Sequence, residues 1–221
     1  MKISVLVPTK NEPLINELVE EVHCVLKNIE HEIIVIDKSD IRPSIKNAKL
    51  VIQQSDGLGK AILEGLPHAS GGVIVTMDGD FSHDPNDLHK LIKKVNGYDI
   101  VIGSRFVSGS KTEDELHRRF ITFLFRKFAS FILDLNVEDS MSGFVAIRRD
   151  VYENLKLNPI GYKINMEIMF KSKKKNYKLY EIPITFHKRR AGASKAGISF
   201  SGLKEAFKTL RFVFELKLGL R

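Results

Sequence analysis

The sequence has no tryptophan, only one cysteine and no long run of apolar residues. Cys24 has no partner for a disulfide within the chain and cannot form a zinc site with other cysteines. No apolar run approaches the roughly 18 residues of a membrane-spanning helix, and the chain does not begin with a signal-peptide pattern. Because 43% of the 221 residues are hydrophobic, intrinsic disorder is also excluded. We expect one intracellular domain, either soluble or peripheral on a membrane.

Acidic residues are scarce in the second half of the chain. Residues 1–110 hold 12 Lys and Arg against 15 Asp and Glu, whereas residues 111–221 hold 23 against 12, for a net charge of +8. The excess of positive charge in the second half suggests a nucleic acid, a membrane surface or a phosphorylated ligand as its partner. The alternative is a set of solvated basic helix faces.

Apolar, β-branched runs alternate with helical patterns in residues 1–110. This alternation is typical of a mostly parallel sheet covered on both faces, so we expect a doubly wound α/β fold. Asp84 and Pro85 supply a helix cap and a first helical residue. The predicted strands span 2–9, 32–37, 49–53, 72–77 and 99–103, and the predicted helices span 12–27, 58–68 and 85–95.

Residues 111–221 are less regular. Pro183 interrupts a strand-like run, which indicates an edge position in the sheet. The sequence has no internal repeat, low-complexity tract or linker, and it therefore predicts a single domain. The predicted helices of this half span 116–133, 163–175 and 199–218, and the predicted strands span 143–147 and 179–186.

Polar clusters follow four of the predicted strands. They begin at Pro8, Asp37, Asp78 and Gly103. Ligands of an open parallel sheet bind beyond the carboxyl ends of its strands, so these clusters are expected to meet at one edge. Helix caps would explain any one of them, but all four together indicate a ligand site.

Asp78-Gly79-Asp80 is the most informative of these clusters. On an extended segment the two carboxylates project to the same face and can approach one cation. Such hard oxygen ligands suit Mg²⁺ or Mn²⁺, with the remaining ligands coming from water and substrate phosphates. Ser82 can add a further ligand, whereas His83 is expected to be an exposed loop histidine. The alternative for the whole cluster is a surface turn after a strand.

Two basic segments are ambiguous when considered alone. The run from Arg189 to Lys195 offers guanidinium forks, a hydroxyl and an ammonium to a phosphate, or else it is an ordinary basic loop. The last segment places apolar and basic residues at helical spacing, which suits an anionic membrane surface, a core-packed helix or a dimer helix. Its apolar residues are Leu203, Phe207, Leu210, Phe214 and Leu218, and its basic residues are Lys204, Lys208, Arg211 and Lys217.

Nine segments spread over nearly the whole chain form a combined signature: VPTKNE at 7–12, IDKSD at 36–40, GLGKAILEG at 57–65, MDGDFSHDP at 77–85, VIGSRF at 101–106, DSMSGFVAIRRDV at 139–151, GYKINMEI at 161–168, EIPITF at 181–186 and RRAGASK at 189–195. In these segments and in their order, the chain resembles glycosyltransferase family 2, and within it the dolichol-phosphate mannosyltransferase group. The resemblance implies a single-domain, nucleotide-sugar-binding GT-A-type (Rossmann-like) fold with a mostly parallel central sheet.

The resemblance also implies a reaction and its partners. The expected activity is metal-dependent transfer of mannose from GDP-mannose to dolichyl or polyprenyl phosphate with inversion, using Mg²⁺ or Mn²⁺. The expected location is the cytoplasmic face of a membrane, with a separate membrane-anchoring subunit as a candidate partner. The catalytic domain over 1–221 would comprise a nucleotide-sugar and metal half over 1–110, an acceptor half over 111–198 and an amphipathic helix over 199–221.

Site residues are carried over by matching positions. The nucleotide sugar would contact Pro8, Thr9, Glu12, Asp37, Gly59, Lys60, Asp78, Gly79 and Asp80. The metal would bind Asp78, Asp80 and Ser82. The acceptor phosphate would contact Arg105, Ser142, Arg189, Ser194 and Lys195, with Asp139 nearby. The residues implied in catalysis are Asp80, Arg105 and Arg189.

Two departures from the family pattern and one absence refine this interpretation. Lys38 stands where the family usually has a second acid, which affects part of the nucleotide contact, and Ser82 replaces a common Gln. A chain without tryptophan cannot contain the Gln-x-x-Arg-Trp motif of the polymerising synthases of the family. A UDP-glucose or UDP-N-acetylhexosamine donor, a hydroxyl acceptor and an inactive membrane-associated adaptor remain as alternatives. Nucleic acid is not expected, because no aromatic and basic interleaving of a known type occurs.

Overall fold

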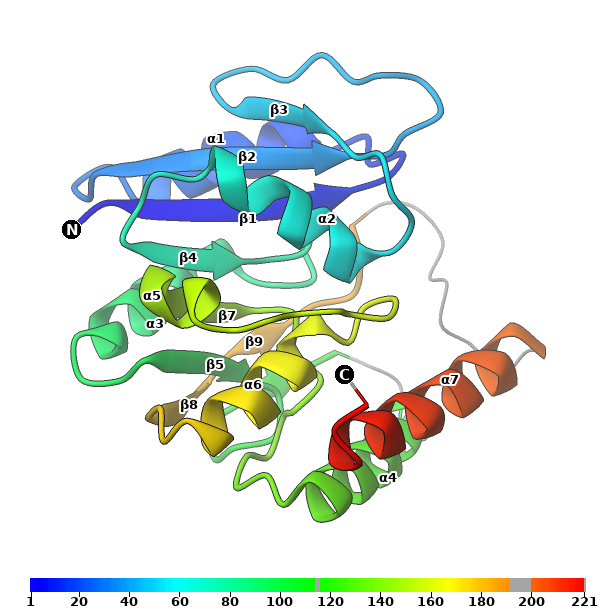
Figure 1. Ribbon diagram of the computed structural model, residues 1–221. Helices are drawn as coiled ribbons and strands as arrows, with labels where there is room; N and C mark the ends of the chain where they lie inside the picture. The colour runs from blue at the N-terminus through cyan, green and yellow to red at the C-terminus, as the bar shows by residue number, and fades with distance from the viewer. Residues whose placement is uncertain (114–115, 191–199, 221) are drawn as a thin grey trace.

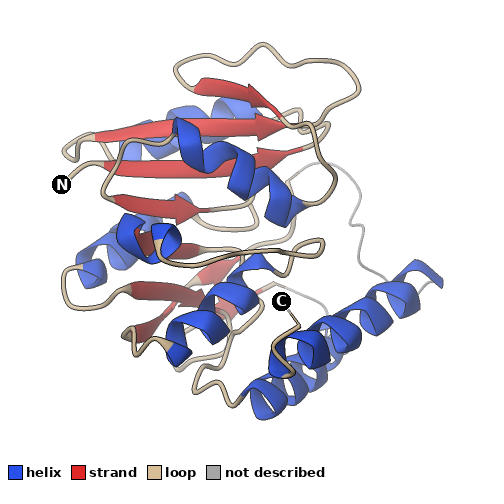
Figure 2. Ribbon diagram, in the orientation of Figure 1, coloured by secondary structure: helices blue, strands red, loops and turns tan. Residues whose placement is uncertain are grey.

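A seven-stranded sheet forms the centre of the molecule (Figures 1 and 2). The computed structural model describes residues 1–113, 116–190 and 200–220, and the side chains of these except 116–122 and 200–206. The strand order is β3-β2-β1-β4-β7-β5-β8, and a second sheet pairs β6 with β9. The strands are β1 Ile3–Thr9, β2 His31–Asp37, β3 Lys49–Ile52, β4 Val73–Thr76, β5 Ile100–Ser104, β6 Lys111–Thr112, β7 Val145–Arg148, β8 Leu179–Pro183 and β9 Thr185–Phe186.

Helices cover both faces of the sheet and enclose two hydrophobic cores. The apolar stripes of α1 and α3 pack on one face, and those of α2, α5 and α6 pack on the other together with α4 and α7. This arrangement follows from strands that are apolar on both sides. The helices are α1 Ile15–Val25, α2 Leu58–Gly65, α3 Leu88–Val95, α4 Leu116–Leu133, α5 Arg149–Glu153, α6 Ile164–Lys174 and α7 Phe200–Lys217, with short 3-10 turns at Leu66–His68 and Pro85–Asp87.

The predicted α/β fold with a mostly parallel sheet is confirmed, including two of its finer details. The Asp84 side chain accepts a hydrogen bond from the Asn86 amide and caps the turn that leads into α3. Strand β8, which ends at Pro183, is the last strand of the sheet, as its proline indicated. Helix α1 begins at Ile15 and not at residue 12, because Asn11 has a positive φ of 54° and Pro13 follows it.

Strand β7 confirms the strand predicted over 143–147, but its place in the sheet was not predicted. It comes from the second half of the chain, yet it lies between β4 and β5 and is antiparallel to both. All other strands of this sheet are parallel. The amino end of β7 therefore lies at the carboxyl edge of the parallel strands. Residues 142–144, which precede β7, are brought to that edge.

Helices α4 and α7 pack side by side against the remainder of the molecule (Figure 1). Their buried residues include Ala129 and Leu133 on α4 and Phe212, Val213 and Leu216 on α7. In the apolar stripe predicted from the sequence, Phe207, Phe214 and Leu218 are exposed and Leu210 is half-buried, while the Leu203 side chain lies outside the described residues. The Phe214 ring still contacts the Phe128 ring of α4, with centroids 6.2 Å apart. The last helix thus packs on the core through one face and keeps apolar side chains on its surface. Among the described helices, none is long and apolar enough to cross a bilayer.

Candidate active site

The polar clusters predicted after the strands meet at one edge of the sheet. Strands β1, β2, β4 and β5 run in the same direction, so their last residues share that edge. Asp37 and Thr9 are aligned there in the register of β1 and β2. The ring of Phe186 joins two of these strand ends, because it lies 5.5 Å from the ring of His83 after β4 and 5.1 Å from the guanidinium of Arg105 after β5.

The Asp78-Gly79-Asp80 segment is a turn and not the extended segment that was expected. It follows β4, and Phe81 just after it has a φ of 62°. The Asp80 carboxylate accepts hydrogen bonds from the Ser82 amide at 3.0 Å and the Ser82 hydroxyl at 2.5 Å. The Asp78 side chain remains one-third exposed, whereas that of Asp80 is 7% exposed. The turn therefore offers one accessible carboxylate and one that is held in place.

His83 is buried, so its assignment as an exposed loop histidine is wrong. Its ring stacks on Phe144 with centroids 4.9 Å apart, and only 2% of the residue is exposed. The Asp78 amide donates a hydrogen bond to His83 Nδ1 at 3.1 Å. Burial lowers the pKa of His83, which keeps the ring neutral and fixes Nδ1 as an acceptor. His83 thus holds the acidic turn in place through the hydrogen bond that it accepts from the Asp78 amide.

The segment before β7 closes around the same turn. A Cβ on Gly143 would lie 3.2 Å from Asp78 Oδ1 and 3.3 Å from His83 Cε1. The Gly143 carbonyl accepts a hydrogen bond from Thr76 at 2.8 Å. The Ser142 hydroxyl donates to the Gly103 carbonyl at 2.7 Å, so it ties β7 to the end of β5. Only a residue without a side chain keeps the Asp78 carboxylate free of contact at this position.

Arg105 is held by Asp139 through a two-point ion pair. Its Nε and Nη2 atoms donate to Oδ2 and Oδ1 of Asp139 at 2.8 Å and 2.9 Å, and its amide donates to Oδ2 at 3.1 Å. Burial opposes ionisation of Asp139, but the charge and hydrogen bonds of Arg105 outweigh it and lower the pKa of Asp139. Arg105 is therefore a fixed cation at the edge of the sheet.

Arg189 lies directly on the acidic turn, where its Nε contacts Asp80 Oδ2 at 2.7 Å. The backbone after β9 runs along the turn, because the His187 amide donates to the Ser82 carbonyl at 2.8 Å and the Arg190 amide to the Asp80 carbonyl at 3.4 Å. The Arg189 side chain is 40% exposed. It can therefore reach a bound anion as well as Asp80.

The proposed nucleotide end of the site is built on β1 and β2. Thr9 and Ser39 donate hydrogen bonds to the Asp37 carboxylate at 2.7 Å and 2.6 Å, and Asp37 is 1% exposed. Burial raises the pKa of Glu12, and the nearby Asp80 carboxylate adds to the rise. Lys38 contacts Asp56 Oδ1 at 2.7 Å and thereby ties the end of β2 to the loop before α2.

The remaining predicted residues differ in their surroundings. The Gly59 amide donates to the Gly161 carbonyl at 2.6 Å, so it is engaged in packing α2 against the 159–161 loop. Lys60 is exposed and Pro8 is half-buried. A Cβ on Gly79 would lie 2.9 Å from Thr9 Cγ2, which explains a glycine there by its contact with β1. Ser194 and Lys195 lie outside the described residues.

The donor set of the turn fits a hard divalent cation. Asp78 and Asp80 supply carboxylate oxygens, Ser82 supplies a hydroxyl, and Gly143 leaves room beside Asp78. No group of three His, Cys, Asp or Glu side chains gathers for a metal within the described part of the chain. A cation at the turn would therefore take its remaining ligands from water and from a bound diphosphate.

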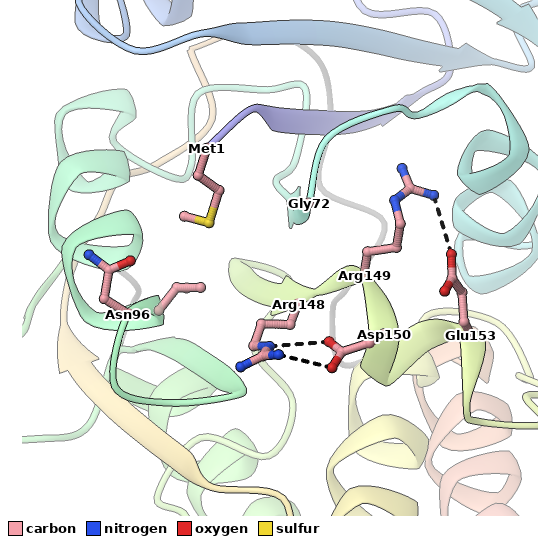
Figure 3. Close-up of a pocket in the computed structure, with 8 residues that line it drawn as sticks. Met1, Gly72, Asn96, Arg148, Arg149, Asp150 and Glu153 are labelled. Atoms are coloured by element: carbon pink, nitrogen blue, oxygen red, sulfur yellow. Dashed lines mark hydrogen bonds and ion pairs between the residues drawn. The ribbon is translucent and has the colours of Figure 1, made fainter.

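A hollow at the opposite edge of the sheet lacks these properties (Figure 3). It is lined by Met1, Gly72 and Asn96 and by the start of α5. Arg148 is paired with Asp150 there at 3.0 Å. The positive charges of the hollow are paired with acids of the same hollow, so it offers no unbalanced charge to a ligand.

Comparison with known proteins identifies the family of the chain. Residues 4–156 match the family model described as Glycosyl transferase family 2. The chain is 37% identical to the dolichol-phosphate mannosyltransferase of Pyrococcus furiosus, over 98% of this chain and 64% of that protein. It is 31% identical to the polyprenol monophosphomannose synthase of Mycolicibacterium smegmatis, over 91% of this chain and 83% of that protein. It is 29% identical to the undecaprenyl-phosphate mannosyltransferase of Micrococcus luteus, over 88% and 87%.

Comparison with solved structures shows the same fold in a known protein. The glucosyl-3-phosphoglycerate synthase of Mycobacterium tuberculosis, solved with Mn²⁺, UDP and phosphoglyceric acid, matches with a TM-score of 0.72 and 20% identity. The match covers 99% of this chain and 78% of that chain. The likeness in fold and the match over more than half of the sequence agree, and the chain belongs to glycosyltransferase family 2.

Proposed function

We propose that this protein transfers mannose from GDP-mannose to dolichyl or another polyprenyl phosphate, with inversion at the anomeric carbon. The observation that carries this proposal is the juxtaposition of an acidic turn, Asp78 and Asp80, with the cations Arg105 and Arg189. Arg189 contacts Asp80 at 2.7 Å, and the Arg105 guanidinium lies 5.1 Å from the ring of Phe186, which packs against His83. The reaction brings two anionic substrates together, so it needs both a metal-binding acidic pair and fixed positive charge. The three relatives support mannose as the sugar and a polyprenyl phosphate as the acceptor.

Asp78, Asp80 and Ser82 would hold the Mg²⁺ or Mn²⁺ ion. A divalent cation at the turn would neutralise the charge that develops on the departing diphosphate. The Mn²⁺ and UDP in the similarly folded synthase support a metal of this kind. Thr9, Asp37 and Glu12, with Pro8 at the end of β1, would line the nucleotide. Gly59, Lys60 and Gly79 would lie at the boundary of this subsite.

The chemical step needs no general base from the chain. A phosphate monoester is largely ionised at neutral pH, so one of its oxygens attacks the anomeric carbon directly. The new oxygen–carbon bond forms as the bond to the diphosphate breaks, and the electron pair leaves with the nucleoside diphosphate. Arg105 and Arg189 would hold the attacking phosphate, together with Ser142, Ser194 and Lys195. His83 is not a candidate base, because its Nδ1 already accepts a hydrogen bond from the Asp78 amide.

We also propose a peripheral location on the cytoplasmic face of a membrane, and the α4–α7 pair supports the contact with a membrane. Phe131, Phe207 and Leu218 are 83%, 71% and 70% exposed. Exposed basic residues on α7 accompany them, as expected for a surface that meets anionic lipid: Lys208, Arg211 and Lys217. This chain spans 64% of the length of the Pyrococcus relative. A separate membrane-anchoring subunit is a candidate partner for this surface.

Binding to lipid vesicles tests the surface. Changing Phe131 and Phe207 together to serine should weaken cosedimentation with phosphatidylglycerol vesicles by about tenfold or more, because each buried apolar side chain contributes about 1.5–3 kcal/mol. Ile41→Ser is the matched control, since Ile41 is 86% exposed but lies in the loop after β2. Equal binding by the two variants would exclude the α4–α7 pair as the surface that binds lipid.

A donor screen tests the reaction. The protein is incubated with Mn²⁺, a polyprenyl phosphate in vesicles and labelled GDP-mannose, UDP-glucose or UDP-N-acetylhexosamine, and the lipid product is extracted into chloroform. We expect label in the lipid from GDP-mannose. Label from a UDP-sugar would reassign the donor, and label on a hydroxyl acceptor would reassign the acceptor. Vesicle binding without transfer from any donor would point to an inactive adaptor.

A further inference from the structure

Arg126 is a buried arginine that the proposed reaction does not use. It lies on α4 and is 4% exposed. Its guanidinium carbon lies 4.0 Å from the ring centre of Phe106 and 4.8 Å from that of Phe123, so it is enclosed by two aromatic rings. Its Nη1 donates to the Glu138 carbonyl at 2.5 Å and to the Glu138 carboxylate at 2.6 Å.

The segment that Arg126 contacts carries the partner of Arg105. Asp139 follows Glu138 directly and is completely buried. The amides of Glu138 and Asp139 donate to the Glu181 carboxylate at 2.6 Å and 2.8 Å. Contacts from α4 on one side and β8 on the other thus hold this segment. The Asp139 carboxylate in turn holds the guanidinium of Arg105 at two points.

We propose that Arg126 is a positioning residue that connects the α4–α7 pair to Arg105 through the backbone of Glu138 and the carboxylate of Asp139. Arg105 projects from the end of β5, where its direction depends on the Asp139 carboxylate. Side chains on the same helix as Arg126, Leu124 and Phe131, are exposed and apolar. The proposed lipid surface is therefore joined to a cation of the site by two contacts, Arg126 with Glu138 and Asp139 with Arg105, and the peptide bond between Glu138 and Asp139 links them. The part of the inference that concerns catalysis rests on the proposed function.

Lys127 provides a matched control because it contacts the same acid. Its Nζ lies 3.2 Å from Glu138 Oε1, but the side chain is 50% exposed and has no contact with the Glu138 carbonyl in the described structure. Arg126→Met removes the contact with the backbone, and Lys127→Met removes only an exposed ion pair. Arg126→Lys restores a donor of the same charge, and Glu138→Gln keeps the carbonyl that the inference requires.

The first measurement compares transfer rates with the donor that the screen identifies. Arg126→Met should lower kcat by about tenfold to a hundredfold, because a displacement of about 1 Å in a positioning group has effects of that size. The KM for the nucleotide sugar should stay within about twofold, because Arg126 does not touch the nucleotide end. Arg126→Lys should recover part of the loss, and Lys127→Met and Glu138→Gln should keep near-normal rates. Equal losses in Arg126→Met and Lys127→Met would overturn the inference.

The second measurement does not depend on transfer. In ¹H–¹⁵N spectra of the whole chain, the Nε–H of Arg105, assigned with Arg105→Lys, should exchange slowly because it donates to Asp139. Its exchange should become at least about tenfold faster in Arg126→Met and stay unchanged in Lys127→Met. An unchanged Arg105 signal in a folded Arg126→Met variant would overturn the inference, even if transfer is confirmed. If wild type transfers no sugar, the proposed function fails and this measurement still decides the role of Arg126; if Arg126→Met does not fold, Arg126→Lys is used.

Discussion

Two arginine–aspartate pairs lie at opposite edges of the same sheet and differ in burial and not in chemistry. Arg105 and Asp139 meet at two points, at 2.8 Å and 2.9 Å, at the carboxyl edge. Arg148 and Asp150 make the same two-point contact, at 3.2 Å and 3.0 Å, at the amino edge. The side chains of the first pair are 15% and 0% exposed, and those of the second are 49% and 48% exposed.

The difference shows that burial determines how firmly such a pair holds its two side chains. Water screens an exposed pair, which then contributes little to stability and leaves each side chain free to move. A buried pair is costly to form and costly to break, so each partner fixes the other in place. The pair of Arg189 and Asp80 lies between these cases, with side chains 40% and 7% exposed. Fixed charge is what the proposed site for two anionic substrates would need, and a fixed cation, Arg105, is found at the carboxyl edge.

The largest effect is expected for Asp139→Asn. Removing the buried negative charge leaves Arg105 without its counter-charge, and we expect a loss of about 3–5 kcal/mol in the free energy of unfolding. Urea unfolding monitored by circular dichroism measures this loss. A change no larger than that of Asp150→Asn would contradict the role assigned to burial.

Asp80→Ala should have the next largest effect, and on transfer more than on stability. It removes the carboxylate that Ser82 and Arg189 hold at the turn, together with a proposed metal ligand. We expect metal-dependent transfer to fall by about a hundredfold or more. Calorimetric titration of Mn²⁺ in the presence of GDP gives a second readout. Near-normal rates or an unchanged Mn²⁺ affinity would exclude Asp80 as a ligand.

Arg189→Ala should lower transfer by about tenfold, by weakening the contact with the acceptor phosphate, because the side chain is 40% exposed and water screens its charge. The measurement is the KM for polyprenyl phosphate. Lys174→Ala is the control, because Lys174 is an exposed cation at the end of α6. If the two variants had the same KM, Arg189 would be no more than a surface charge.

Glu32 extends the comparison to an acid at the amino edge. Hydrogen bonds from Ser4 and Ser70 outweigh its partial burial and lower the pKa of Glu32 to about 2. Because the pKa is lower in the folded state, this group stabilises the fold above its ordinary value of 4.5, and the contribution is lost as the pH falls toward 2. Glu32→Gln should therefore destabilise the protein at pH 7 but not near pH 2, with transfer unaffected. Unfolding curves at several pH values measure the difference, and a gap that persists at pH 2 would argue against ionisation as its source.

Asp150→Asn should have the smallest effect. Both side chains of its pair are about half exposed, and Asp99 lies 3.7 Å from the same arginine. We expect a change of less than about 0.5 kcal/mol in the free energy of unfolding and no change in transfer. A larger loss of stability would contradict the difference that we draw between the exposed pair and the buried pair.

Most of the fold and half of the site were predictable because they depend on local pattern. Apolar runs ending in polar residues located β1, β2, β4 and β5, and the shared direction of parallel strands brought Asp37, Asp78 and Arg105 to one edge. The prediction that the acidic segment is extended was wrong, because a residue with positive φ, such as Phe81 after the turn, is not visible in the hydrophobic pattern. The burial of His83 was also missed. It depends on Phe144 and Phe186, which are distant in sequence.

The sequence by itself determined the order of the elements, the edge at which the polar clusters gather and the acidic and basic residue types present there. These features follow from periodicity and from residue chemistry, which act within a few positions of the chain. Only the tertiary structure decided that antiparallel β7 enters between β4 and β5, that Gly143 faces Asp78 and that Asp139 fixes Arg105. It also decided which face of α7 is buried. Strand pairing and burial depend on contacts between segments far apart in sequence, so no local pattern predicts them.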